Sequence, residues 1–205
     1  AWTAGIDWTP KFHTAIWKTN ASTTDWNTAS NWSTGSVPTA DVNVMIPVQQ
    51  SGASNYPIIS NSGAVAKNIT VNTSAALTIN RDSDLTLSGN LVNRGTITLN
   101  SDANEFASII VQGTSSGNII YKRWVADEDT SGGTGWDLIG SPVAGQSISS
   151  FVSANSNIAD NSNQYAIGVF SNNGSTDTAA AMYSNYTSDG AGSTVNVSDA
   201  GNFTV

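Results

Sequence analysis

Short apolar alternations recur through the middle of the chain, between residues 61 and 122. Apolar side chains occupy every second position in six segments that are evenly spaced along the chain: Ile69/Val71, Leu77/Ile79, Leu85/Leu87, Ile97/Leu99, Ile109/Val111 and Ile119/Tyr121. A period of two is typical of a strand with one buried face. Asn, Asp, Ser and Gly fill most of the intervening positions, and these residues favour turns. The pattern therefore predicts a series of short strands.

Two all-β architectures fit such a series. A β-solenoid stacks rungs of about 20 residues, each made of two or three short strands. A β-sandwich throughout is the alternative, and it would show similar strands with more varied loops. The even spacing favours the solenoid, as does a row of outward positions filled by β-branched side chains that suit a sheet surface: Thr70, Thr78, Thr86 and Thr98. We further expect residues 108–111 and 118–121 to form a hairpin across Gly113–Gly117.

The chain divides into three zones by composition. Residues 1–60 hold five of the seven Trp residues and are expected to form an N-terminal cap with the first strands. Residues 61–122 form the Thr- and Asn-rich solenoid. Residues 123–205 are expected to form a β-rich, sandwich-like region, with one short helix at 146–152 and strands at 136–143 and 165–170. Because the sequence stops within an apparent strand, we expect a truncated chain.

A Trp- and Asn-rich motif lies between residues 26 and 47. It reads Trp26, then Asn31-Trp32, then a Gly-x-x-Pro turn and an Asp-x-x-x-x-Ile-Pro segment. The open end of a solenoid exposes an apolar core and unpaired strand edges. Two Trp rings close together in the sequence supply a large area to cover that end. The alternative interpretation is that Trp26 and Trp32 form an exposed platform for stacking sugars.

This motif resembles one that opens the solenoid of secreted bacterial β-helix, adhesin-like proteins. A second stretch, Gly117–Arg123 followed by Trp136–Gln146, is similar to segments of large surface proteins of the Bacteroidetes, especially flavobacteria. The resemblance covers roughly residues 24–150. It implies a protein of the bacterial cell surface, exported across the outer membrane as cargo of the type IX secretion system.

Charge is scarce, and small polar residues replace it. Only 11% of the 205 residues are charged, whereas 29 are Ser, 23 are Thr and 23 are Asn. Seven Lys and Arg against 15 Asp and Glu give a net charge of −8, which disfavours nucleic acid as a partner. No apolar run approaches the ~18 residues of a membrane-spanning helix. With no Cys, the chain has no disulfide, thiolate zinc site or catalytic cysteine.

Few residues are candidates for chemistry, and no catalytic constellation is recognisable. Asp127, Glu128 and Asp129 form the densest acidic stretch and could supply oxygen ligands to calcium. A solvated acidic loop is the other interpretation, and no further cofactor is expected. Thr178 follows Asp177 in a pattern similar to the O-glycosylation site of Bacteroidetes surface proteins.

These observations favour a non-enzymatic, extracellular structural or adhesive module of a bacterial surface protein. A carbohydrate-binding module attached to a secreted enzyme is one alternative. A self-assembling filament or surface-layer subunit is another. The expected partners are surface glycans, other copies of the chain and the export machinery of the outer membrane.

Overall fold

Parallel strands build the first of two units in the chain. The computed structural model describes residues 14–50, 54–124, 145–156, 158, 160–161, 164–170 and 183–187. Unit 1 spans Ala1–Asp137 and unit 2 spans Leu138–Val205.

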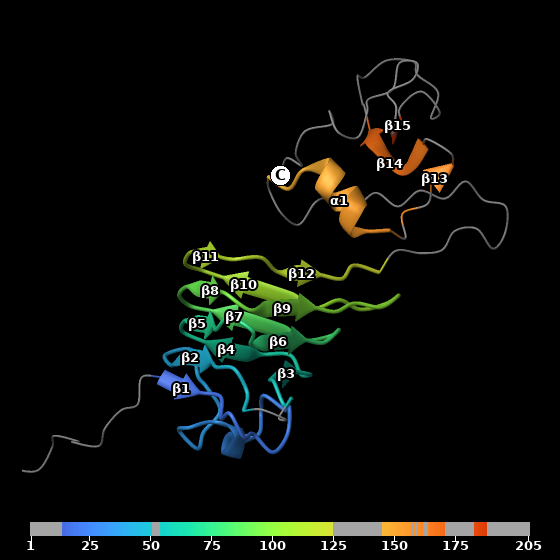
Figure 1. Ribbon diagram of the computed structural model, residues 1–205. Coiled ribbons are helices and arrows are strands. Elements are labelled where there is room, and N and C mark those ends of the chain that lie inside the picture. The colour runs from blue at the N-terminus through green and yellow to red at the C-terminus, as the bar shows by residue number, and fades with distance from the viewer. Residues whose placement is uncertain are drawn as a thin grey trace, which may run out of the picture. The chain divides into compact units, whose positions relative to one another are not determined.

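The described strands of unit 1 form three parallel sheets (Figure 1). The sheet orders are β1-β2-β5-β8-β11, β3-β6-β9-β12 and β4-β7-β10. The chain therefore visits the three sheets in turn and then returns to the first. The strands are β1 (Thr14–Ile16), β2 (Asn43–Ile46), β3 (Ile58–Ile59), β4 (Ala64–Ala66), β5 (Ile69–Val71), β6 (Ala76–Ile79), β7 (Asp84–Leu87), β8 (Leu91–Asn93), β9 (Thr96–Leu99), β10 (Ser108–Val111), β11 (Ser115–Ser116) and β12 (Ile120–Tyr121).

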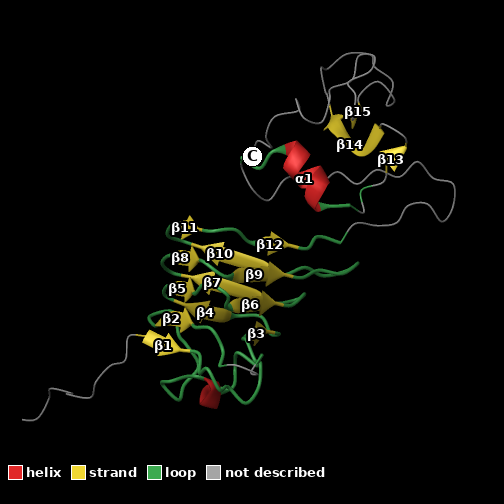
Figure 2. Ribbon diagram, in the orientation of Figure 1, coloured by secondary structure: helices red, strands yellow, loops and turns green. Residues whose placement is uncertain are grey.

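The register between strands defines the rungs of a β-solenoid. Leu77 of β6 pairs with Ile97 of β9, one rung later along the chain. Ile69 of β5 pairs in the same way with Leu91 of β8. All the described strand pairs of this unit are parallel, so equivalent residues of successive rungs lie side by side (Figure 2). The predicted fold class is confirmed, with about three turns of solenoid.

The alternating residues pack as the sequence predicts. Inward side chains from all three sheets are fully or almost fully buried: Ile69, Val71, Leu77, Ile79, Leu85, Leu87, Ile97 and Leu99. The Thr residues between them face outward and are half-buried, because their neighbours in adjacent rungs cover part of each side chain. Burial falls in the last described rung, where Ile109 and Tyr121 are only partly covered.

One local prediction is wrong. Residues 108–111 and 118–121 do not form a hairpin. Strand β10 pairs in parallel with β7, and β12 pairs in parallel with β9, in two different sheets. The Gly-rich segment between them instead carries β11, which joins the remaining sheet next to β8. Parallel pairing places Ile109 beside Leu85 and Tyr121 beside Leu99, so these strands continue the core of the rung below, which a hairpin between them would not do.

Three buried Trp rings close the β1 end of the solenoid. Trp32 lies between the other two, with ring centroids 4.9 Å from Trp17 and 4.7 Å from Trp26, both in edge-to-face geometry. The indole N–H of Trp32 donates to the carbonyl of Trp26 at 2.8 Å, and that of Trp17 donates to the carbonyl of Asn55 at 2.7 Å. Edge-to-face packing aligns positive ring edges with negative ring faces and adds to the burial of apolar area.

Asn31 holds in place the loop that carries Trp26 and Trp32. Its side-chain amide donates to the carbonyl and hydroxyl of Thr23 and to the carbonyl of Asp25. Asn31 ends a short 3₁₀ helix, η1 (Ala29–Asn31), and is fully buried. The Asn-Trp pair of the motif thus does two things: Asn31 fixes the loop, and Trp32 fills the end of the core.

Unit 2 combines one helix with an antiparallel sheet in its described part. Helix α1 (Ile148–Ala154) begins after Ser147, whose hydroxyl accepts a hydrogen bond from the backbone N–H of Ser150. Strands β13 (Asp160–Asn161), β14 (Gln164–Phe170) and β15 (Tyr183–Thr187) form the sheet in that order. The predicted helix and the predicted strand at 165–170 are confirmed, whereas the strand expected at 136–143 lies outside the described residues. No helix in the described part of either unit is long and apolar enough to cross a membrane.

Because Trp32 contacts both other rings of the cap, we expect its removal to destabilise the protein strongly. Replacing Trp32→Ala removes both edge-to-face contacts and opens a cavity, so the free energy of unfolding should fall by about 3–5 kcal/mol. Trp124→Ala is the matched control, because that ring is 44% exposed and its loss should change stability by less than about 1 kcal/mol. Urea denaturation followed by circular dichroism measures both, and equal losses would show that the cap does not hold the solenoid.

Candidate functional site

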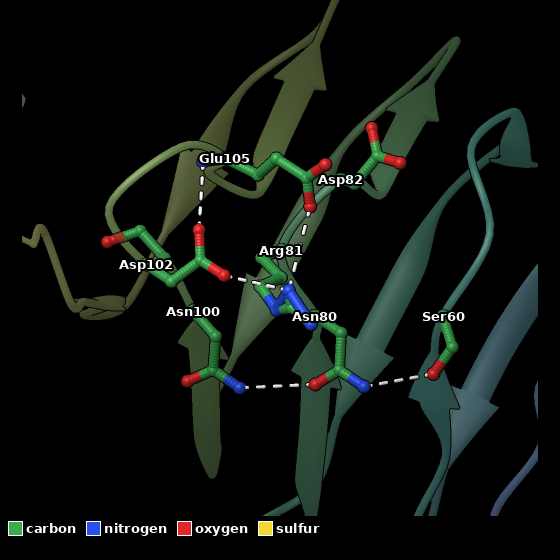
Figure 3. Close-up of a pocket in the computed structure, with 8 residues that line it drawn as sticks. Ser60, Asn80, Arg81, Asp82, Asn100, Asp102 and Glu105 are labelled. Carbon is green, nitrogen blue, oxygen red and sulfur yellow. Dashed lines mark hydrogen bonds and ion pairs between the residues drawn. The ribbon is translucent and has the colours of Figure 1, made fainter.

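A row of polar side chains runs across three rungs where strands β3, β6 and β9 end. The side-chain amide of Asn80 donates to the hydroxyl of Ser60 at 2.9 Å, and the side-chain amide of Asn100 donates to the side-chain oxygen of Asn80 at 3.2 Å (Figure 3). These residues share the spacing of the rungs, so the in-register sheet brings them together. We call Ser60, Asn80 and Asn100 the amide row.

The amide row forms one wall of an open concavity of about 520 Å³. The other lining residues come from the turns after β6 and β9, and include one guanidinium and three carboxylates: Arg81, Asp82, Ser101, Asp102 and Glu105. With one positive and three negative side chains, the concavity carries a formal charge of −2. Polar and charged groups therefore dominate its lining.

Arg81 links two successive turns. Its guanidinium lies 2.7 Å from a carboxylate oxygen of Asp102 and 3.7 Å from one of Glu105 (Figure 3). Both ion pairs are largely exposed, so each contributes little to stability by itself. Their effect is geometric, because they hold the turn of one rung directly against the turn of the next.

Asp102 is held in its charged form. Its carboxylate accepts hydrogen bonds from the backbone N–H groups of Asn104 at 3.0 Å and Glu105 at 2.9 Å. These two bonds, and then the neighbouring Arg81, lower the pKa of Asp102 below its ordinary value of 3.8. A general acid needs the opposite shift. Asp102 therefore orders the turn and holds Arg81, and its environment is unsuited to donating a proton.

A second polar ladder lies at the corner that precedes β5 and β8. The amide of Asn68 donates to the side-chain oxygen of Asn43 at 2.7 Å, and the side-chain oxygen of Asn68 accepts from the backbone N–H of Asn90 at 2.6 Å. Asn90 repeats the arrangement by accepting from the backbone N–H of Thr114 at 2.9 Å. Each side chain thus satisfies a backbone group of the next rung, where the chain turns and no strand partner is present.

Positions 89 and 113 at this corner have room only for glycine. A Cβ atom on Gly89 would lie 2.2 Å from the side-chain oxygen of Asn68, and one on Gly113 would lie 2.3 Å from that of Asn90. Both glycines therefore leave space for the oxygen that binds the following residue. The Asn and Gly residues at this corner are thereby explained by the stacking of the rungs.

The structure places the predicted site residues as follows. Trp26 and Trp32 are fully buried, so their rings belong to the cap and cannot form a platform for sugars. The calcium candidates, Asp127, Glu128 and Asp129, lie outside the described residues, as does the glycosylation candidate Thr178. Within the described part of the chain, no three His, Cys, Asp or Glu side chains are grouped as metal ligands would be.

Sequence reasoning missed the concavity. The local pattern at Asn80–Ser83 and at Asn100–Asp102 indicates only turns between strands. One signal could have revealed the site: the interval from Asn80 to Asn100 equals the interval from Leu77 to Ile97. Aligning the rungs on that interval places two Asn-x-Asp turns side by side.

Comparison with known proteins identifies the family but not an activity. The family described as a domain of unknown function, DUF8693, matches residues 16–204. The chain therefore belongs to that family, and the match includes strands of both units. No curated protein and no solved structure matches the chain.

The close approach of Gly89 to Asn68 predicts that substitutions at these two positions have non-additive effects on stability. Gly89→Ala forces its Cβ against Asn68 and Lys67, so the free energy of unfolding should fall by about 1–3 kcal/mol. In an Asn68→Ala background the same change should cost less, since the closest atom is gone. A double-mutant cycle by urea denaturation measures the difference, and identical costs in the two backgrounds would contradict the packing.

The hydrogen bonds of Asp102 predict a pH-dependent contribution to stability. Since the folded state lowers the pKa of Asp102, the charged carboxylate stabilises the protein above pH 3.8 and loses this effect as the pH falls through the lowered value. Asp102→Asn should thus reduce the urea midpoint at about pH 7, and the difference from wild type should shrink below about pH 3. Asp82→Asn serves as the control, because Asp82 accepts no hydrogen bond from the described residues. A difference that stays constant with pH would rule out the charge as the cause.

Proposed function

We propose that the protein is a non-enzymatic, extracellular module that gives a bacterial surface protein a rigid, adhesive segment. The observation that carries this proposal is the capped solenoid itself. Its rungs stack in register, three buried Trp rings close one end, and the outward positions of the strands hold mainly uncharged side chains. Such a body resists bending and presents a regular surface over several rungs, which suits a spacer or an adhesive element.

The chemistry of the concavity supports a binding role over a catalytic one. Both Asp102 and Glu105 are engaged by Arg81, and the pKa of Asp102 is lowered. Paired-carboxylate hydrolysis needs one carboxyl group that stays protonated near neutral pH. Amide, hydroxyl and guanidinium groups along one edge instead match the requirements of reversible polar recognition.

The proposal extends to location and export. The motif at residues 26–47 resembles the opening of bacterial surface solenoids, and the chain is rich in Thr, Asn and Ser with few charges. We therefore infer export to the cell surface of a member of the Bacteroidetes by the type IX secretion system. Surface glycans are the partners that this location offers.

Self-assembly is a second candidate, favoured by the last described rung. Ile110 of β10 and Ile120 of β12 point outward and are 55% and 50% exposed. Each of these strands pairs on one side only within the described sheets. Open strand edges with apolar side chains can associate with another copy of the chain.

Adhesion under flow tests the proposed function. Microspheres coated with the full chain should be retained severalfold better than albumin-coated microspheres on surfaces that carry bacterial or mucin glycans. A surface coated with the chain itself provides the arm for self-assembly. Chromatography of the glycans after incubation tests for cleavage, and release of shorter products would contradict a non-enzymatic role. Retention equal to that of albumin on every surface would contradict an adhesive one.

A further inference from the structure

The hydrogen-bonding capacity of the concavity exceeds what the protein itself uses. Each side-chain amide has two N–H donors. The bonds of the amide row use one donor of Asn80, to Ser60, and one of Asn100, to Asn80. Within the described residues, the remaining N–H groups and the exposed carboxylate of Asp82 are therefore free to bind a ligand. A ligand that matches this set must both donate and accept at short intervals, as sugar hydroxyl groups do.

The direction of the site follows from the rungs. The amide row runs along the solenoid axis, and neighbouring parallel strands are about 4.8 Å apart. Asp82 and Asp102 come from equivalent positions of adjacent turns, 20 residues apart like Asn80 and Asn100. Equivalent polar groups are thus presented in a line, which suits an extended chain with repeating hydroxyl groups better than a compact small molecule.

The charge of the site restricts which chain can bind. Asp82, Asp102 and Glu105 outnumber Arg81, and the whole protein carries a charge of −8. Uronic acids and sulfated sugars would bring further negative charge into this hollow and would be repelled. The ion pairs already occupy the guanidinium, so Arg81 has limited capacity to compensate for an incoming carboxylate.

We propose that this concavity binds a segment of an uncharged glycan chain lying along the solenoid axis, and that its carboxylates exclude acidic glycans. This inference rests on the proposed adhesive function and names the ligand class of the same site. Because the hollow is open to solvent and encloses little of a ligand, a single site should bind weakly. Many copies on one surface would raise the apparent affinity through multivalency.

Side-chain amide NMR tests the location of binding. The full chain, labelled with ¹⁵N, is titrated with neutral glucan oligosaccharides and with oligogalacturonates of equal length. The neutral series should shift the amide signals of Asn80 and Asn100, while the signals of Asn43 and Asn68, in the ladder at the other corner, stay in place. The oligogalacturonates should bind at least about tenfold more weakly, which corresponds to about 1.4 kcal/mol.

One variant tests the contribution of the amide row to binding, and a second tests the contribution of the carboxylates to selectivity. Asn100→Ala should weaken binding of the neutral series severalfold, whereas Asn43→Ala should not. The double variant Asp82→Asn with Glu105→Gln should reduce the preference for neutral over acidic oligosaccharides, and both exposed positions tolerate these changes without loss of packing.

The outcomes distinguish this inference from the proposed function. Retention on glycan surfaces together with shifts confined to other residues would overturn the site and leave the adhesive role standing. Acidic oligosaccharides that bind as tightly as neutral ones would overturn the charge argument. No retention on any surface, whatever the NMR result, would contradict the proposed function itself.

Discussion

Register between successive rungs is the constraint on which the rest of this structure depends. Each turn of the solenoid must return the chain to the same sheet with the same side facing inward, because a slip of one residue would move every apolar side chain to the surface. Backbone hydrogen bonds along the strands do not by themselves prevent such a slip. Burial of the apolar face opposes it, and the Asn ladders add a second constraint, because the side-chain oxygens of Asn68 and Asn90 each accept from one particular backbone N–H of the next rung.

The open ends of the stack need a different solution from its middle. Inside the solenoid each rung buries its core against two neighbours, whereas the first described rung has a described rung on one side only. Trp17, Trp26 and Trp32 supply the missing surface, and Asn31 holds the loop that carries them. The Trp rings cover the core at this end, and backbone hydrogen bonds from the cap loop to Ile16 and Ile58 occupy the edges of β1 and β3.

The candidate site is a by-product of the same repetition. Stacked rungs place the turns of successive rungs in contact, which is how Arg81 meets Asp102 in the next rung. A line of amides and a cluster of charges then lie together at one edge. A site made in this way is extended and repetitive, which is why a polymeric, hydroxyl-rich ligand suits it better than a small one that must be enclosed.

The sequence by itself determined the all-β class and the period-two strands, since both depend on local patterns. It favoured a cap for Trp26 and Trp32, and their burial in the structure decided it. It also excluded a basic binding surface, because seven Lys and Arg are too few to form one. Tertiary structure decided that each rung has three strands. No local pattern predicts Ala64–Ala66 or Leu91–Asn93, because Ala and an inward Asn93 give little apolar signal and are buried only by the sheets on either side. Tertiary structure also decided that β10 and β12 continue separate sheets, and that Asn80 meets Asn100. Those contacts depend on the total length of each rung, turns included, and the 20-residue interval becomes informative only once the strands that share a sheet are known.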